Sequence, residues 1–304
     1  MINLKKVVVF IPAFNEGESI GAGIDNIRAL YPLEVTRIKG YEMEILVVND
    51  GSEDNTEEIT KLKEVKLISH PKNLGLGAAT RTGMETAYDM GADIAIKMDG
   101  DFQHDPVYLE KVMYPILEDR ADICLGSRFA GKINYKMPLL RYIGNKFFTW
   151  LMNRLTDYRI TDAQTGLVAC NRKYLAIFEI HGNFNSPQQL LIDAHNKHMR
   201  YTEIPVVVNP RTKGQSFINS KYPFYVIANI IRILIDANPL RVFSFIGLIF
   251  IIFSIFYLIL TELSGIFGWK TSFDIPTPSL IILVLGVQTI FFGILADLIL
   301  RKRR

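Results

Sequence analysis

Two long apolar runs without charges constrain this chain more than any other feature. Residues 242–261 form a run of 20 and residues 275–296 a run of 22. At ~1.5 Å of rise per residue, either run is long enough as a helix to cross a hydrocarbon core ~30 Å thick. The alternative is a hydrophobic hairpin inside a soluble core, but no other part of the chain is long enough to cover two such helices. We therefore predict two transmembrane helices.

Positive charges flank these runs unequally. Arg232 and Arg241 precede the first run and residues 301–304 follow the second, whereas Lys270 is the sole basic residue between them. Because cytoplasmic flanks of membrane helices are rich in Lys and Arg, we expect a multi-pass protein of the cell membrane with its catalytic domain and both termini on the cytoplasmic side. The apolar run at 7–11 is too short for a signal peptide.

The overall charge and the cysteines exclude several classes of function. A net charge of +3 that gathers beside the apolar runs suits anionic lipid headgroups better than nucleic acid. Cys124 and Cys170 form no CxxC pair, which indicates a reducing compartment and argues against zinc or redox chemistry. The oligomeric state stays open, and a homo-oligomer is among the alternatives.

The first 210 residues alternate short β-branched runs with amphipathic stretches, which predicts an α/β fold with a mostly parallel sheet. We expect strands at 7–11, 44–48, 65–69, 93–98, 122–125 and 203–208. We expect helices at 54–63, 76–90, 106–118, 139–155 and 187–198, and one between the first two strands that packs Ile20, Ile24, Ile27 and Leu30 on the sheet. The predicted organisation is a catalytic domain at 1–216, an amphipathic juxtamembrane segment at 217–240 and a two-helix anchor at 241–300.

Polar residues follow the predicted strands, where open α/β sheets bind ligands. After the fourth strand, Asp99 and Asp101 flank a glycine, and two carboxylates this close repel each other unless a cation shares them. Such oxygen ligands suit Mg²⁺ or Mn²⁺ completed by substrate phosphates. A solvated Asp-Gly-Asp turn is the alternative, but the position after an apolar strand, with Gln103 and His104 close behind, favours a metal site.

The turn after the second strand offers two further carboxylates. Asp50 is placed to accept hydrogen bonds from a base or ribose, or simply to shape the turn, and these residues alone do not separate the two roles. Asp54 is expected to cap the next helix. The later turn at 73–79 superficially resembles a phosphate loop but lacks both the third glycine of a dinucleotide site and the GK[ST] ending of a P-loop.

Taken together, six segments resemble the family 2 glycosyltransferases of GT-A fold and, more narrowly, the dolichyl-phosphate and polyprenyl-phosphate sugar synthases. They run in order along residues 7–216 and are PAFNE at 12–16, NDGSEDNT at 49–56, NLGLGAA at 73–79, DGDFQHDP at 99–106, GSRF at 126–129 and TDAQTG at 161–166. The resemblance implies a GT-A fold and inverting transfer of a sugar from a nucleotide diphosphate to a polyprenyl or dolichyl phosphate.

The same resemblance implies roles for individual residues. It assigns the base and ribose to Pro12, Phe14, Glu16 and Asp50, and the metal to Asp99, Asp101 and Gln103. Asp99 is counted among the nucleotide-binding residues as well. It assigns the lipid phosphate to Arg128 and Arg141 and the donor diphosphate to Arg211. A planar guanidinium suits each phosphate contact because it binds two oxygens and keeps its charge.

The chemistry so implied needs little acid or base. A lipid phosphate is already an anionic nucleophile, so positioning and charge neutralisation are the main requirements. Asp162 or Asp193 is a candidate to orient a donor hydroxyl, although either also suits a structural role at a helix. The chain departs from its relatives at Gln189, where many carry glutamate, and at Ser216-Phe217, where a serine-lysine pair is usual.

Two rival functions remain at this point. One is a polysaccharide synthase or a transferase with a soluble acceptor, although the Gln-x-x-Arg-Trp signature of processive synthases is absent. The other is a catalytically silent sensor of nucleotide sugars or a scaffold at the membrane, which the intact DGD and arginines disfavour. For the donor, the segment at 161–172 favours UDP-glucose or UDP-N-acetylglucosamine over GDP-mannose.

Overall fold

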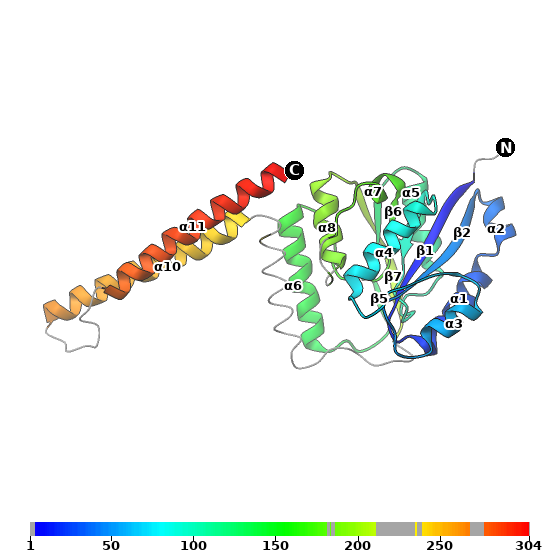
Figure 1. Ribbon diagram of the computed structural model, residues 1–304, viewed down its shortest axis with the longest axis horizontal. Coiled ribbons are helices and arrows are strands. Elements are labelled where there is room, and N and C mark those ends of the chain that lie inside the picture. Colours follow the sequence, from blue (N-terminus) through cyan, green and yellow to red (C-terminus); the bar gives the residue numbers. More distant parts are fainter. Residues whose placement is uncertain are drawn as a thin grey trace. The chain divides into compact units, whose positions relative to one another are not determined.

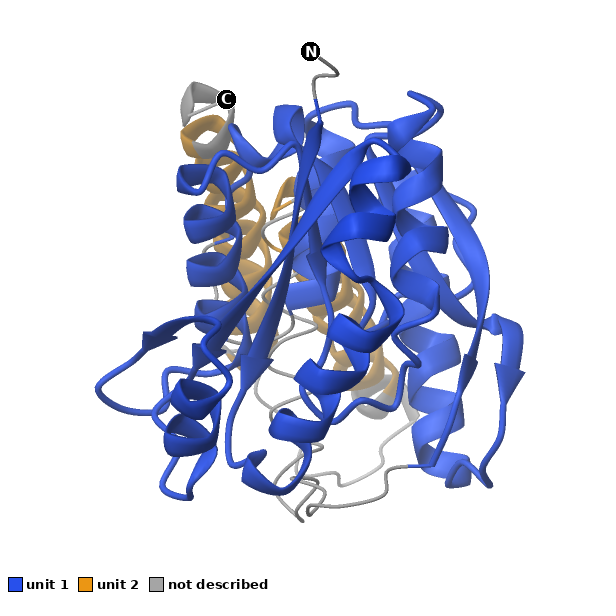
Figure 2. Cartoon of the chain, turned by 90° about the vertical axis from the view of Figure 1, so that its right-hand side faces the viewer, with its two compact units in different colours: residues 1–218 blue, residues 219–304 orange. Residues whose placement is uncertain are grey.

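A computed structural model describes residues 4–180, 183, 186–210, 235, 239–267 and 277–303 (Figure 1). The chain divides into two compact units, residues 1–218 and residues 219–304 (Figure 2). Arg211, the Ser216-Phe217 pair and nearly all of the predicted juxtamembrane segment lie outside the described residues.

The first unit is built on a seven-stranded sheet in the order β3-β2-β1-β4-β6-β5-β7. β6 is antiparallel to both of its neighbours, and every other pair is parallel. This confirms the predicted α/β fold with a mostly parallel sheet. The strands are β1 Lys5–Ala13, β2 Tyr41–Asn49, β3 Lys66–Ser69, β4 Ile94–Lys97, β5 Ile123–Ile133, β6 Val168–Asn171 and β7 Tyr201–Val208.

All six predicted strands are present, but β6 was not predicted. It is only four residues long, and it is fixed by pairing with β4 on one side and β5 on the other rather than by a local β-branched run. Strand β5 is longer than predicted because its outer half continues beside β7 past an irregularity between Ser127 and Lys132.

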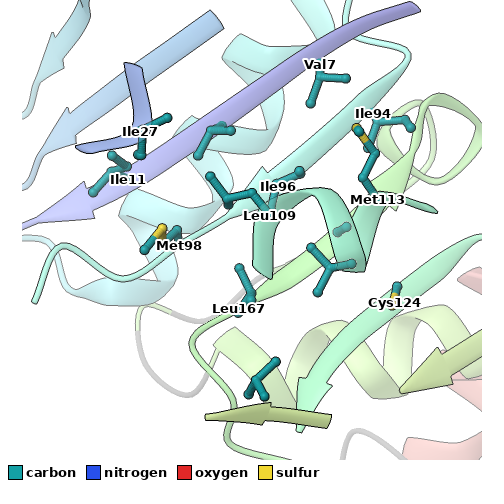
Figure 3. Packing of buried hydrophobic residues seen from close by; sticks show 14 of the residues in the cluster. Val7, Ile11, Ile27, Ile94, Ile96, Met98, Leu109, Met113, Cys124 and Leu167 are labelled. Carbon is teal, nitrogen blue, oxygen red and sulfur yellow. The ribbon is translucent and has the colours of Figure 1, made fainter. Parts of the chain in front are cut away.

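The helices cover both faces of the sheet. They are α1 Gly17–Leu30, α2 Leu33–Ile38, α3 Thr56–Leu62, α4 Leu76–Asp89, α5 Tyr108–Leu117, α6 Leu139–Thr156, α7 Arg172–Leu175 and α8 Ser186–Asn196. The short helices α2 and α7 were not predicted. On one face, Val7, Val9 and Ile11 of β1 pack against α1 and α5 in the main core (Figure 3). Phe10 of β1 points to the other face, against Gly83 of α4.

One expected core residue is outside the core. Ile20, Ile24 and Ile27 of α1 are buried as predicted, but Leu30 is 42% exposed. Leu30 is the last residue of the helix, and the next residue, Tyr31, packs against the core in its place. The prediction for Leu30 was therefore wrong because the helical pattern was extended to the point where the helix ends.

The described residues of the second unit form a hairpin of two helices, α10 Pro239–Phe267 and α11 Thr277–Arg303. Gly247 lies against Gly286, and Ser254 Oγ donates a hydrogen bond of 2.6 Å to the Ser279 carbonyl, so the two helices run antiparallel. A methyl group on Gly247 would lie 2.6 Å from the Gly286 oxygen, so close contact requires glycine there.

Both helices are long and apolar enough to cross a membrane, and 11% and 17% of their apolar stretches are buried. So little burial disfavours a hairpin enclosed in a soluble core. Residues 275 and 276 of the second predicted run lie outside the described residues.

Candidate active site

The polar residues singled out above meet at one edge of the sheet in the first unit. Strands β1, β2, β4 and β5 end there, and since β6 runs the other way, the segment that enters β6 lies at the same edge. The contacts confirm this arrangement: Arg128 of β5 is bonded to Asp162, and Asp99 after β4 lies against Gly166. The reversed strand thus adds a third segment between the ends of β4 and β5.

The turn after β1 is tied to the turn after β2 by hydrogen bonds from backbone N–H groups to side-chain oxygens. Asn15, with a positive φ of 54°, donates its N–H to Ser52 Oγ at 3.0 Å and accepts from the Glu53 N–H at 2.9 Å. The Glu16 N–H donates to Thr56 Oγ1 at 2.9 Å. The two turns are therefore built as one unit before any ligand is present.

The β1 turn also contacts the DGD segment. Ser19 Oγ lies 3.0 Å from Glu16 Oε2 and 3.1 Å from the Gly100 carbonyl oxygen. The Pro12 carbonyl oxygen faces Gly100 as well, and Phe14 is half-buried beside this turn in the sequence. The structure therefore brings Pro12 and Glu16, expected at the nucleoside, next to the residues expected at the metal.

Asp50 is only 3% exposed and shapes a third turn. Its carboxylate accepts hydrogen bonds from the Leu74 N–H at 3.0 Å and the Gly75 N–H at 2.8 Å, and it lies 2.7 Å from His70 Nδ1. Of the two roles left open for Asp50, the structural one thus has direct contacts. A contact with a base or ribose stays a prediction.

Asp54 holds the first residues of two helices. One carboxylate oxygen accepts from the Thr56 N–H of α3 at 3.0 Å, and the other accepts from the Gly17 N–H of α1 at 2.9 Å. Burial alone would raise the pKa of Asp54, but these hydrogen bonds and the one from the Thr56 hydroxyl outweigh it and lower the pKa. The N-cap position of α3 is Asn55, one residue later than predicted, but the Asp54 carboxylate still accepts from the first N–H group of α3 and of α1.

The DGD segment follows β4 directly. Asp99 is bonded to Lys97 Nζ, and the two side chains are 35% and 4% exposed, respectively. Asp101 accepts a hydrogen bond from the Gln103 N–H at 3.1 Å. Gln103 is in turn held at the end of β7, where its carbonyl accepts from the Asn209 N–H at 3.0 Å. The loop is thus fixed at both ends.

These residues fit a divalent cation. The Asp99 and Asp101 carboxylates and the Gln103 amide supply the hard oxygen ligands that Mg²⁺ and Mn²⁺ prefer. The described residues contain no group of three or more His, Cys, Asp or Glu side chains that could hold a metal alone. The remaining ligands of such a cation would come from water or from substrate phosphates. Space beside Asp99 is limited, because a methyl group on Gly166 would lie 2.1 Å from Asp99 Oδ2.

Arg128 is buried in a two-pronged ion pair with Asp162. Nε lies 2.6 Å from Oδ2 and Nη2 lies 2.8 Å from Oδ1, and Nη2 also donates to the Gln164 carbonyl at 2.9 Å. Burial alone would raise the pKa of Asp162, but the bonds to Arg128 outweigh it and lower the pKa. Among the described residues, nothing accepts a hydrogen bond from Arg128 Nη1.

The remaining candidates are spread over the second half of the unit. Arg141 lies half-buried in the first turn of α6, and Gln189 lies half-buried on α8. Asp193 of α8 accepts from the Tyr174 hydroxyl at 2.8 Å and pairs with Lys197 at 2.7 Å. These contacts give Asp193 a structural role within α8 and its surroundings.

Two site residues were given no role from the sequence. Lys97 interrupts an apolar strand two residues before Asp99, and alternation along a strand places i and i+2 on one face, so this pattern was available. His104 is 4% exposed, and among the described residues neither its Nδ1 nor the buried Tyr135 hydroxyl has a hydrogen-bond partner. Burial lowers the pKa of His104 to about 4, against the opposing charge of Asp99.

An apolar surface lies next to this edge. Leu139, Leu140 and Trp150 of α6 are 60–78% exposed. A cavity of about 660 Å³ lies where the chain passes from β5 to α6. It is lined by Ile133, Tyr135, Lys136, Met137, Pro138, Leu139 and Tyr142. A larger cavity of about 990 Å³ lies at the opposite edge, near Tyr31 and Glu118, and is therefore remote from the candidate site.

The mostly parallel sheet with helices on both faces is a fold of GT-A type, the fold of many glycosyltransferases. Residues 8–178 match the model of glycosyl transferase family 2, more than half of the chain. The chain belongs to this family and is a glycosyltransferase, as the resemblance implied.

Two curated relatives extend the comparison. The UDP-N-acetylglucosamine–dolichyl-phosphate N-acetylglucosaminyltransferase of Methanococcus voltae is 31% identical over 66% of this chain and 85% of its own length. The undecaprenyl-phosphate 4-deoxy-4-formamido-L-arabinose transferase of Yersinia pestis is 27% identical over 97% of this chain and 88% of its own length. The second alignment covers nearly the whole chain and so includes the helical hairpin.

Solved structures support the fold. Glucosyl-3-phosphoglycerate synthase from Mycobacterium tuberculosis, determined with Mn²⁺, UDP and phosphoglyceric acid, has a TM-score of 0.58 and 17% identity. The match covers 76% of this chain and 78% of that one. At this identity the likeness establishes a shared fold and nothing finer.

Proposed function

We propose that this chain transfers a sugar from a nucleotide diphosphate to a polyprenyl or dolichyl phosphate, with inversion at the anomeric carbon. A phosphate oxygen of the acceptor forms the new bond to that carbon. The bond to the donor diphosphate breaks, and the nucleotide diphosphate leaves with the electron pair. The observation that carries this proposal is the meeting of the DGD carboxylates with the Arg128–Asp162 pair at one sheet edge.

Each residue at this edge has a part in the proposal. Asp99, Asp101 and Gln103 would hold Mg²⁺ or Mn²⁺, which when bound supplies positive charge to the departing diphosphate. Asp162 accepts hydrogen bonds from Nε and Nη2 on one edge of the Arg128 guanidinium and so fixes its orientation, which leaves Nη1 for the acceptor phosphate. Arg141 would add a second cationic contact from α6. Arg211 is proposed for the donor diphosphate on the resemblance alone.

A lipid acceptor agrees with the apolar parts of the molecule. The hairpin α10–α11 suits a membrane anchor, and the exposed apolar residues of α6 suit contact with the bilayer surface. The basic residues beside the anchor favour a cytoplasmic location for the catalytic unit and both termini. The two named relatives carry a dolichyl phosphate and an undecaprenyl phosphate in their names, which supports the same acceptor class.

For the donor we favour UDP-N-acetylglucosamine or UDP-glucose over GDP-mannose. The segment at 161–172 and the name of the Methanococcus voltae relative support this choice. Gln189, which replaces a glutamate common in relatives, is the first residue to vary when the sugar is being assigned.

The test follows transfer of label from radioactive UDP- and GDP-sugars to a short polyprenyl phosphate, with the full chain in detergent and Mn²⁺ present. We expect label in the lipid phase from one donor, and loss of that label with EDTA or with Asp101→Ala. Glu118→Ala removes an exposed carboxylate away from the site and should leave transfer unchanged. Nucleotide-sugar binding without any lipid product would exclude the lipid acceptor and favour a soluble acceptor or a sensor.

A further inference from the structure

Lys97 is a buried cation to which the reaction described above assigns no role. It is the last residue of β4, a central strand flanked by β1 and β6, where it lies opposite Phe10 and Val168. Its side chain is 4% exposed, and its ammonium group contacts the Asp99 carboxylate. Asp99 is the only described residue that pairs with it.

A buried ammonium group depends on its counter-charge. Removing the partner of a buried ion leaves an uncompensated charge, which is far more costly than losing an exposed pair. In the free protein, the buried Lys97 ammonium group is therefore stable only while it is paired with the Asp99 carboxylate. The Asp99 side chain, by contrast, is 35% exposed, so a cation can reach its carboxylate.

Binding of a divalent cation at Asp99 disturbs this pair. The cation draws on the same carboxylate and repels the ammonium at short range, in surroundings where charges are weakly screened. Lys97 must then share Asp99 or find another anion. Under the proposed function one anion reaches this place together with the cation, namely the diphosphate of the donor.

We infer that Lys97 is a positioning residue that makes the cation and the nucleotide diphosphate bind cooperatively. In the free protein its ammonium occupies Asp99 and weakens binding of a cation alone. When the diphosphate binds, the Lys97 ammonium group forms an ion pair with it, and the Asp99 carboxylate becomes available to the cation. This inference rests on the proposed function only in that the ligand is a nucleotide diphosphate; it makes no use of the acceptor.

The experiment measures Mn²⁺ binding to the full chain in detergent by the decrease of the free Mn²⁺ signal in electron paramagnetic resonance, with and without UDP. For the unaltered chain we expect UDP to strengthen Mn²⁺ binding by about a hundredfold. The Coulomb energy of two charges ~4 Å apart near a protein surface is large enough for a gain of this size. In Lys97→Met, Mn²⁺ alone should bind about tenfold more tightly and the gain from UDP should fall to about tenfold. Lys97→Arg keeps the charge and should preserve most of the gain.

Lys5→Met is the matched control. Lys5 also pairs with an aspartate next to β4, since its Nζ lies 3.2 Å from Asp93, but at the opposite end of that strand. This variant should bind Mn²⁺ and UDP as the unaltered chain does. Thermal unfolding and gel filtration check that each variant is folded, and Lys97→Gln takes the place of Lys97→Met if the methionine variant does not fold.

The outcomes separate this inference from the proposed function. If Lys97→Met gains as much from UDP as the unaltered chain, or loses Mn²⁺ binding whether or not UDP is present, the cooperative role is wrong while the proposed function stands. If the unaltered chain binds neither Mn²⁺ nor UDP, both are wrong. Tighter Mn²⁺ binding with a reduced gain from UDP, in Lys97→Met but not in Lys5→Met, supports the inference.

Discussion

The candidate site has two halves that solve the same problem in different ways. In the turns after β1 and β2, carboxylate and amide oxygens accept hydrogen bonds from backbone N–H groups, as Asp50 and Asp54 do. Around β4, β5 and β6, buried side chains of opposite charge pair with each other, as in Lys97–Asp99 and Arg128–Asp162. The first half is thus held by hydrogen bonds from backbone N–H groups. The second half is held by ion pairs, and a charged ligand can compete for either member of such a pair.

This difference indicates which half is preformed and which half responds. A hydrogen bond to the backbone satisfies a group that the fold itself has buried, so a ligand gains nothing by replacing it. An ion pair beside a substrate site is different, because phosphates and metal ions offer each member an alternative partner. We therefore expect the turns after β1 and β2 to keep their hydrogen bonds when a ligand binds. The ion pairs around β4, β5 and β6 should instead exchange partners with the bound phosphates and metal ion.

The largest effect should come from breaking the most buried pair. Asp162→Asn leaves the Arg128 guanidinium without its counter-charge and should destabilise the chain by about 3–5 kcal/mol in chemical unfolding. Replacing both residues with Met and Leu should cost less than the single change, because no charge then stays buried. A loss below about 1 kcal/mol for Asp162→Asn would show that solvent reaches the pair.

A smaller effect is expected in the backbone-held half. Asp50→Ala removes the acceptor for the Leu74 and Gly75 N–H groups and should cost about 2–3 kcal/mol in the same unfolding assay. Asp50→Asn retains one carbonyl oxygen and should cost less. If the alanine variant lost nucleotide binding with unchanged stability, Asp50 would instead act directly on the ligand.

His104 allows the charged half to be tested through pH. Its pKa is about 4 in the folded chain and about 6.5 when unfolded, so the unfolded chain binds more protons between these values and stability falls as the pH falls. From pH 7 to pH 5 this contributes a loss of about 2 kcal/mol. His104→Asn should remove that part of the pH dependence, and an unchanged pH profile would contradict the burial of a neutral imidazole.

The smallest effect concerns the cap shared by two helices. Asp54→Ala leaves the Gly17 and Thr56 N–H groups without their acceptor and should cost about 1 kcal/mol, typical of a lost helix cap. Asp54→Asn, which keeps an oxygen acceptor, is the control. Since the pKa of Asp54 is lowered in the folded chain, its contribution is present above pH ~4 and is lost as the pH falls through the folded pKa.

Most of the fold could be predicted from the sequence because its signals are local. Buried parallel strands are runs of apolar residues, and the polar residues after each run revealed the DGD and the two turns. Strand β6 escaped prediction because its pairing partners, not its own four residues, define it. The exposure of Leu30 depended on where α1 ends, which the helical pattern alone does not give.

The site was only partly predictable because its contacts are not local. Asp99 and Asp101 stand out through their spacing, whereas the partnership of Arg128 with Asp162 joins residues 34 positions apart. The spacing of Lys97 and Asp99 places both on one face, but the ion pair between them and the burial of His104 are evident only in the structure. In a sequence, a lysine that ends a strand looks the same whether its ammonium group is in water or against a carboxylate.

The reversed direction of β6 has a consequence for how this fold can change. The chain leaves the sheet at the end of β5 and returns at the start of β6, and both points lie at the same edge. The segment between them, which includes the cavity and helix α6, therefore begins and ends at the edge that carries the candidate site. An insertion or exchange within residues 134–158 would not alter any strand register, so under the proposed function acceptor preference can diversify while the turns after β1, β2 and β4 stay intact.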